Sequence, residues 1–77
     1  MAEQRDAERW DDRVLLGLLL EHHPAHLARH ELKRELGWDA VRVEDSSTRL
    51  ARAGLAHRQD EFAFATRAAV RFDALGL

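Results

Sequence analysis

Two glycines bracket the stretch that most constrains how this chain can fold, "GWDAVRVEDSSTRLARAGL". Gly37 is placed to close one helix as a left-handed residue, and Gly54 is placed to close the next. Asp39 is an able N-cap residue, so the sequence predicts a helix that begins after Asp39 and ends at Gly54. The inward positions expected along this helix are Val43, Leu50 and Ala53, together with Ser46 or Ser47. The stretch therefore predicts two short helices joined by a tight turn.

A run of apolar residues nearer the N-terminus, Val14 to Leu20, predicts a central helix covered on several sides. This helix is expected to start near Ala7 or Asp11 and to run to about His22. Asp11 and Asp12 suit its N-terminus, where carboxylates cap the backbone and favour the helix dipole. Residues 1–10 are expected to form a polar N-terminal extension, which can itself be helical. After Pro24 the chain restarts at "HLARHELKRELG" as a second helix.

The hydrophobic period changes after Gly54. The segments "LAHRQ" and "FAFAT" flank Asp60-Glu61, and Phe62 and Phe64 alternate with alanines, which predicts a hairpin with one apolar face. The turn lacks glycine, so a loop longer than two residues is an open alternative. Thr66 is placed to cap a last helix, "RAAVRFDALGL". The 77 residues thus predict one small α+β domain that is mostly α-helical.

This order of elements resembles the winged helix-turn-helix domain over roughly residues 11–75, and is similar to small bacterial transcriptional regulators related to the MarR type. Three motifs carry the resemblance: "HELKRELG", "STRLARAGLAHR" and "FAFATRAAVRF". It implies a three-helix core, a two- to three-stranded β-wing and a C-terminal helix. Two positions depart from the family: Ser47 stands where a large aliphatic residue is usual, and the wing tip is Gln59-Asp60-Glu61 rather than basic.

The resemblance implies a transcriptional regulator that binds duplex DNA through the third helix and the wing. Arg42 could bond guanine, Val41 could touch a thymine methyl group, and Glu44 could accept a hydrogen bond from cytosine. Arginine and lysine side chains nearby would contact phosphates and set the register. The candidate DNA-binding residues are Arg29, Lys33, Arg34, Ala40, Val41, Arg42, Glu44, Asp45, Arg49 and Arg58.

The distribution of charge leaves a second interpretation open. The formal net charge is −2, whereas nucleic-acid-binding domains are usually basic. Residues 1–12 hold five acids against two arginines, and residues 29–58 hold seven bases against five acids. The arginines and acids of the third helix could equally form a solvated face of internal ion pairs. The alternative function is therefore a winged-helix module for protein–protein interaction or assembly that does not bind DNA.

The outer helices carry more apolar surface than a small domain easily covers, which predicts a two-fold homodimer. The candidate interface residues are Trp10, Leu16, Leu20, Val70, Phe72 and Leu75. The alternative is that Trp10 and Phe72 pack on the chain's own core.

The sequence predicts no catalytic residues, cofactor or metal site. The histidine spacing 22, 26, 30 is interrupted by Pro24, and the "HExxH" pattern that starts at His30 fails at Arg34. There is no cysteine. The polar N-terminus does not read as a signal peptide, and the apolar run is too short to span a bilayer, so we expect a cytoplasmic protein without a membrane partner.

Overall fold

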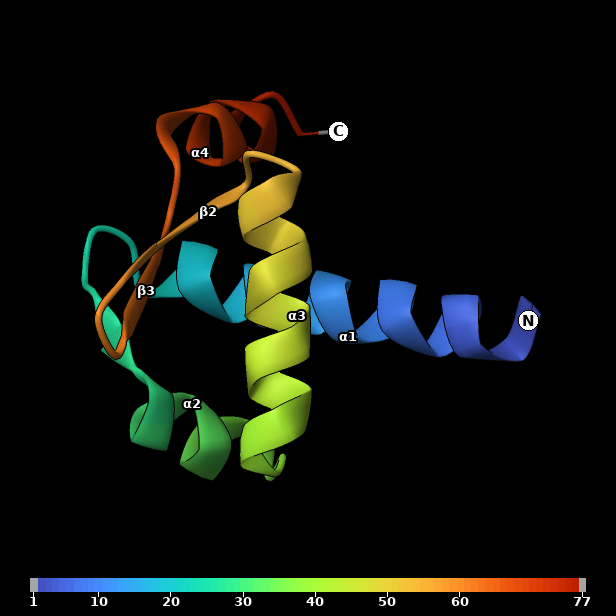
Figure 1. Ribbon diagram of the computed structural model, residues 1–77. Helices are drawn as coiled ribbons and strands as arrows, with labels where there is room; N and C mark the ends of the chain where they lie inside the picture. The colour runs from blue at the N-terminus through green and yellow to red at the C-terminus, as the bar shows by residue number, and fades with distance from the viewer. Residues whose placement is uncertain (1, 77) are drawn as a thin grey trace.

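Four helices and a small antiparallel sheet make up the computed structural model, which describes residues 2–76 (Figure 1). The elements in chain order are α1 (Ala2–Glu21), β1 (Leu27–Ala28), α2 (Arg29–Leu36), α3 (Ala40–Arg52), β2 (Ala56–Gln59), β3 (Phe62–Ala65) and α4 (Arg67–Ala74). The predicted class, α+β and mostly helical, is confirmed. The arrangement is compatible with a winged helix.

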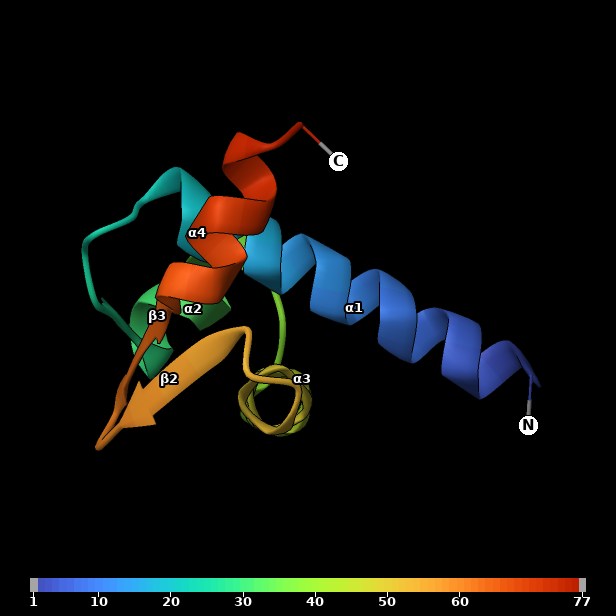
Figure 2. The same cartoon turned by 90° about the horizontal axis from the view of Figure 1, so that it is seen from above.

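Helix α1 begins at Ala2, so the predicted start near Ala7 or Asp11 was wrong. The residues before Asp11 are mostly alanine, glutamate, glutamine and arginine, which are good helix formers and extend the helix upstream. Leu15 and Leu19 are completely buried, whereas the N-terminal half projects beyond the rest of the fold (Figures 1 and 2). Within residues 2–76, no helix is long and apolar enough to cross a membrane.

Helices α2 and α3 meet at the turn that the glycine signal predicted. Gly37 has φ 70°, and its N–H donates to the carbonyl of Lys33 at 2.8 Å. The Asp39 carboxylate accepts a hydrogen bond from the Arg42 backbone N–H at 2.8 Å, which fixes the first turn of α3. The predicted cap and turn are therefore confirmed.

The buried face of α3 consists of Val43, Ser46, Ser47 and Leu50. Both serines are buried, where the sequence had left a choice between them. The inward assignment of Ala53 was wrong, because α3 ends at Arg52 and Ala53 already belongs to the exposed turn.

The sheet has the strand order β1-β3-β2. Strand β1 pairs Leu27 with Ala63, although the sequence had placed this segment at the start of the second helix. The hairpin is tight: Gln59 pairs with Phe62 across a two-residue turn, and Asp60 takes φ 56°. The longer loop is not used, since aspartate tolerates the left-handed region better than most residues.

The buried face of the sheet carries alanines rather than phenylalanines. Ala56, Ala63 and Ala65 lie in the core, while Phe62 is partly exposed. Phe64 stacks on His26 with ring centroids 3.9 Å apart. The predicted alternation is confirmed, and the alanines form the buried face because α1 and α3 lie against the hairpin and small side chains leave room for them.

The last helix is fixed by the cap that the sequence predicted. The Thr66 hydroxyl oxygen accepts from the Ala69 N–H at 3.1 Å, and the same hydroxyl donates to the Gly54 carbonyl at 2.8 Å. Ala69 is buried, whereas Phe72 is 62% exposed. One threonine therefore joins the end of the α3 segment to the start of α4.

Candidate interaction surface

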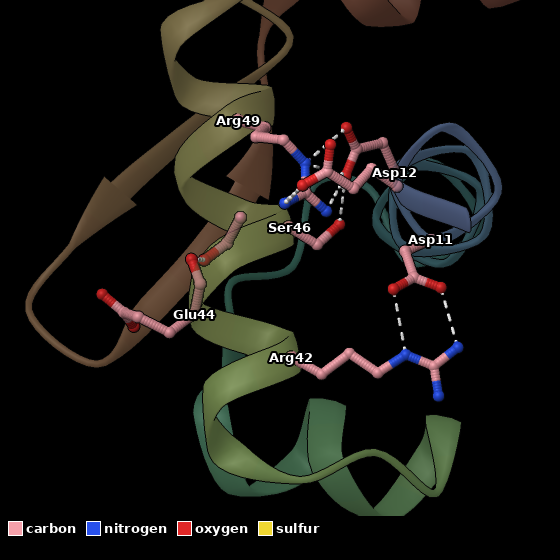
Figure 3. A network of polar contacts seen from close by, with 8 residues as sticks. Asp11, Asp12, Arg42, Glu44, Ser46 and Arg49 are labelled. Carbon is pink, nitrogen blue, oxygen red and sulfur yellow. Dashed lines mark hydrogen bonds and ion pairs between the residues drawn. The ribbon is translucent and has the colours of Figure 1, made fainter. Parts of the chain in front are cut away.

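Helix α3 runs across α1, and the side chains between the two helices form a polar network (Figure 3). The Arg42 guanidinium holds the Asp11 carboxylate with two hydrogen bonds, Nε to Oδ2 at 3.0 Å and Nη2 to Oδ1 at 2.7 Å. It also lies 4.4 Å from the centroid of the Trp38 ring, a cation–π arrangement. The contacts with Asp11 and with the Trp38 ring together orient the Arg42 side chain towards α1.

The electrostatics of Asp11 follow from this contact. The hydrogen bond from Arg42 lowers the pKa of Asp11 below its ordinary value of 3.8, and the charges of Arg42 and Arg49 act in the same direction. Partial burial opposes them. The Asp11 side chain is only 13% exposed, against 47% for Arg42. Asp11 is therefore ionised at neutral pH and neutralises the residue expected to read guanine.

A second cluster lies on the same side of α3. The Arg49 guanidinium contacts both Asp12 oxygens at 3.0 to 3.1 Å and the Glu8 carboxylate at 3.2 Å. Ser46, which is fully buried, donates its hydroxyl proton to Asp12 at 2.6 Å. The hydrogen bond to Asp12 raises the pKa of Arg49. Arg49 is therefore also held in ion pairs with α1.

The opposite side of α3 carries a third cluster, around Glu44. One carboxylate oxygen pairs with Arg29 at 3.2 Å, and the other pairs with Arg58 of β2. Arg58 also donates to the Thr48 hydroxyl at 3.0 Å. Glu44 thus links α3 to both α2 and the hairpin, and its carboxylate is not free to accept a hydrogen bond from a base.

Ser47 has a local partner of its own. Its hydroxyl donates to the Glu44 carbonyl at 3.0 Å, so the buried oxygen has a hydrogen bond within the helix. The small residue that departs from the family pattern is therefore accommodated without an unpaired polar group.

The candidate DNA-binding residues fall into two sets in the structure. Five of them are held in internal ion pairs: Arg29, Arg42, Glu44, Arg49 and Arg58. The others expected to be reachable are exposed: Lys33, Arg34, Ala40, Val41 and Asp45. The structure brings Arg29, Glu44 and Arg58 together, and it separates them from Arg42 and Arg49 by the width of α3.

The sequence interpretation missed the acidic partners on α1. Glu8, Asp11 and Asp12 are spaced to share one helical face, and Arg42, Ser46 and Arg49 do the same on α3. That matching of acids and bases was the available signal. The matching was overlooked because α1 was expected to start at Ala7 or Asp11, and Asp11 and Asp12 were therefore interpreted as N-terminal residues that cap the helix.

The structure also shows an open apolar groove between α1 and α4, with a volume of about 520 Å³. Its apolar lining is Leu16, Gly17 and Leu20 of α1, Leu55, and Ala69 and Phe72 of α4. Trp10 of α1, Phe72 of α4 and Leu75, which follows α4, are each more than 60% exposed, so the alternative that Trp10 and Phe72 pack on the core was wrong. Of the other candidate dimer residues, Leu16, Leu20 and Val70 are half-buried.

The α1–α4 side therefore combines exposed apolar side chains with a groove. No family model, curated protein or solved structure matches this sequence.

Proposed function

We propose that this chain is a winged-helix domain that acts by contacting protein rather than by binding duplex DNA. One observation carries the proposal: Arg29, Arg42, Arg49 and Arg58 are each paired with a carboxylate of the same chain. A paired guanidinium that turned to a phosphate would leave its carboxylate facing the DNA backbone. The exchange would gain little charge neutralisation, which supplies most non-specific affinity for DNA.

The hairpin tip supports the same proposal. Gln59, Asp60 and Glu61 are exposed at the position where a DNA-binding wing presents basic side chains. The two carboxylates there would repel any DNA phosphate that came within about 10 Å, the Debye length at ordinary salt.

The surface proposed to contact protein is the α1–α4 side, defined by Trp10, Phe72, Leu75 and the groove between the helices. Large exposed apolar side chains gathered on one side mark interaction sites. Tryptophan and phenylalanine are enriched in the centres of protein interfaces, where they contribute a large share of the binding energy. Arg13 and Asp73 line the same groove and supply the polar rim that such interfaces have.

Duplex DNA remains the second candidate ligand, supported by a different observation. Lys33, Arg34 and Arg52 are exposed and form no ion pair within residues 2–76, and Val41 is 68% exposed near the start of α3. Because these side chains are not used in internal ion pairs, they are the ones available to contact DNA.

Titration of a labelled mixed-sequence duplex over a salt series separates the two functions. We expect no saturable binding at ~50 mM salt, whereas a DNA-binding protein loses affinity with a log–log slope of about −0.9 per phosphate neutralised. Such a slope would refute the proposal. The double variant Asp11→Asn/Asp12→Asn, which releases Arg42 and Arg49 from carboxylates, is the matched control and is expected to bind DNA more tightly than the parent chain.

A further inference from the structure

The charge that the start of α1 presents to solvent has the opposite sign to the charge of its sequence. Residues 1–12 hold more acids than bases, but Glu8, Asp11 and Asp12 are held by arginines of α3. Among residues 2–13, the charged side chains that form no ion pair in the described part of the chain are three arginines and two acids, Arg5, Arg9, Arg13, Glu3 and Asp6. The unpaired charge of this segment is therefore net basic.

The three arginines form one row along α1. Arg5, Arg9 and Arg13 are spaced by four residues, so they lie on the same side of the helix, and all three are exposed. Leu16 and Leu20 continue this side at steps of three and four, and both line the α1–α4 groove together with Arg13. Like charges four residues apart destabilise a helix, so α1 by itself gains nothing from this arginine row. The row leads directly into the apolar groove.

The row and the groove together have the dimensions of a helix-binding surface. From Arg5 to Leu20 they extend over 15 residues of α1, or about 22 Å along the axis, which corresponds to about four helical turns. The half of α1 that carries the row projects beyond the rest of the fold (Figures 1 and 2). A helix of similar length that lay alongside α1 would contact the arginine row and the groove at once.

We propose, building on the proposed protein contact, that the partner at the α1–α4 side is an acidic amphipathic helix. Its apolar side chains enter the groove, and its carboxylates pair with the arginine row. Amphipathic helices bind hydrophobic grooves through apolar residues spaced three or four apart, and complementary charges select the partner. Trp10 lies beside the row, since Arg9 and Arg13 line the pocket around it, and its 62% exposed indole is available to pack on the same helix.

Two acids at the borders of this surface set the direction of the partner. Asp73 lines the groove on its α4 side, opposite Arg13, so the groove end carries one base and one acid. Asp6 lines the pocket around Trp10, but the row beside it holds three bases. Carboxylates of the partner are therefore favoured along the projecting half of α1, and its apolar residues are favoured in the groove.

Fluorescence anisotropy with three designed peptides, titrated with the full chain, tests this pattern of charge. Each peptide is a helix of about 15 residues with the same leucines in one half. The other half carries glutamate, glutamine or lysine at three positions spaced by four. The glutamate peptide is expected to bind at least about tenfold more tightly than the lysine peptide, with the glutamine peptide between them. The preference should shrink as salt is added, because exposed ion pairs are screened.

Charge reversal in the row separates a direct contact from a structural effect. Arg9→Glu and Arg13→Glu should each weaken binding of the glutamate peptide by at least about tenfold and strengthen binding of the lysine peptide, which a damaged fold would not do. Arg34→Glu is the matched control, because it makes the same charge change at an exposed position of α2 outside the groove. It should leave both affinities unchanged, and circular dichroism should show the parent fold for all three variants.

Equal binding of the glutamate and lysine peptides, or no binding of the glutamate peptide at ~50 mM salt, overturns the acidic-helix inference. So does binding to vesicles that contain phosphatidylglycerol, if Arg9→Glu abolishes it while the glutamate peptide does not bind, because the row would then belong to a lipid surface. Equal binding of all three peptides leaves the protein contact standing. The proposed function fails separately, if the duplex titration shows salt-dependent binding.

Discussion

Two adjacent aspartates in α1 decide what the residues of α3 can do. Asp11 accepts hydrogen bonds from Arg42, and Asp12 accepts them from Arg49 and from the buried Ser46. Their backbone positions are consecutive, so the two carboxylates are directed to different turns of α3 (Figure 3). The acidic N-terminal segment and the basic middle of the sequence are consequently partners of each other.

The Asp11–Arg42 pair predicts a specific pH dependence. The pKa of Asp11 is lower in the folded chain than its ordinary value of 3.8, so its stabilising contribution is complete above that value and is lost as the pH falls further. Asp11→Asn should lower the melting temperature at pH 7, and the difference from the parent should shrink as the pH is lowered below 3.8.

Thermal unfolding followed by circular dichroism from pH 2 to pH 7 measures this difference. Asp6→Asn is the control, because Asp6 is exposed and makes no ion pair within residues 2–76. A difference between Asp11→Asn and the parent that stays constant across the range would show that the ion pair is not its cause.

Among the elements, those fixed by local chemistry were predictable from the sequence. The cap at Asp39, the left-handed Gly37 and the cap at Thr66 each depend on residues within a turn of one another. Strand β1 was missed because two residues form a strand only when β3 pairs with them. The ion-paired state of the candidate site was missed for the same reason, since Arg42 and Asp11 lie 31 residues apart.

The packing of α3 gives a second prediction. Leu50 is buried against the core, as its spacing from Val43 indicated. Leu50→Ala should lower the free energy of unfolding by roughly 2–5 kcal/mol, the usual cost of emptying a buried leucine site. Denaturant unfolding measures it, and a loss within ~0.5 kcal/mol of zero would contradict this assignment of the helix face.

Helix α1 gives a third prediction, through Gly17. Because a Cβ atom there meets nothing within 4 Å among residues 2–76, Gly17→Ala should raise the unfolding free energy of the monomer by about 0.5–1 kcal/mol. Denaturant unfolding at a protein concentration that keeps the chain monomeric tests this value. A destabilised Gly17→Ala monomer would mean that the chain itself needs glycine at this position.

The whole molecule therefore has two surfaces of different character. Around α3, four arginines are paired with carboxylates of α1 or with Glu44. Across α1 and α4, apolar side chains and a groove face solvent. The first surface resembles one that reads DNA, but four of its arginines are already paired with carboxylates, whereas the second exposes apolar side chains to solvent. This division favours contact with protein.

The most direct test follows the Nε–H signals of Arg42 and Arg49 by NMR while duplex DNA is added at ~50 mM salt. In the free chain these protons are donated to Asp11 and Asp12, at 3.0 Å and 3.0 to 3.1 Å. Lysine substitution at each position assigns the two signals. We predict that both signals stay unchanged as DNA is added; saturable shifts or broadening of these signals would contradict the claim that Arg42 and Arg49 stay paired within the chain.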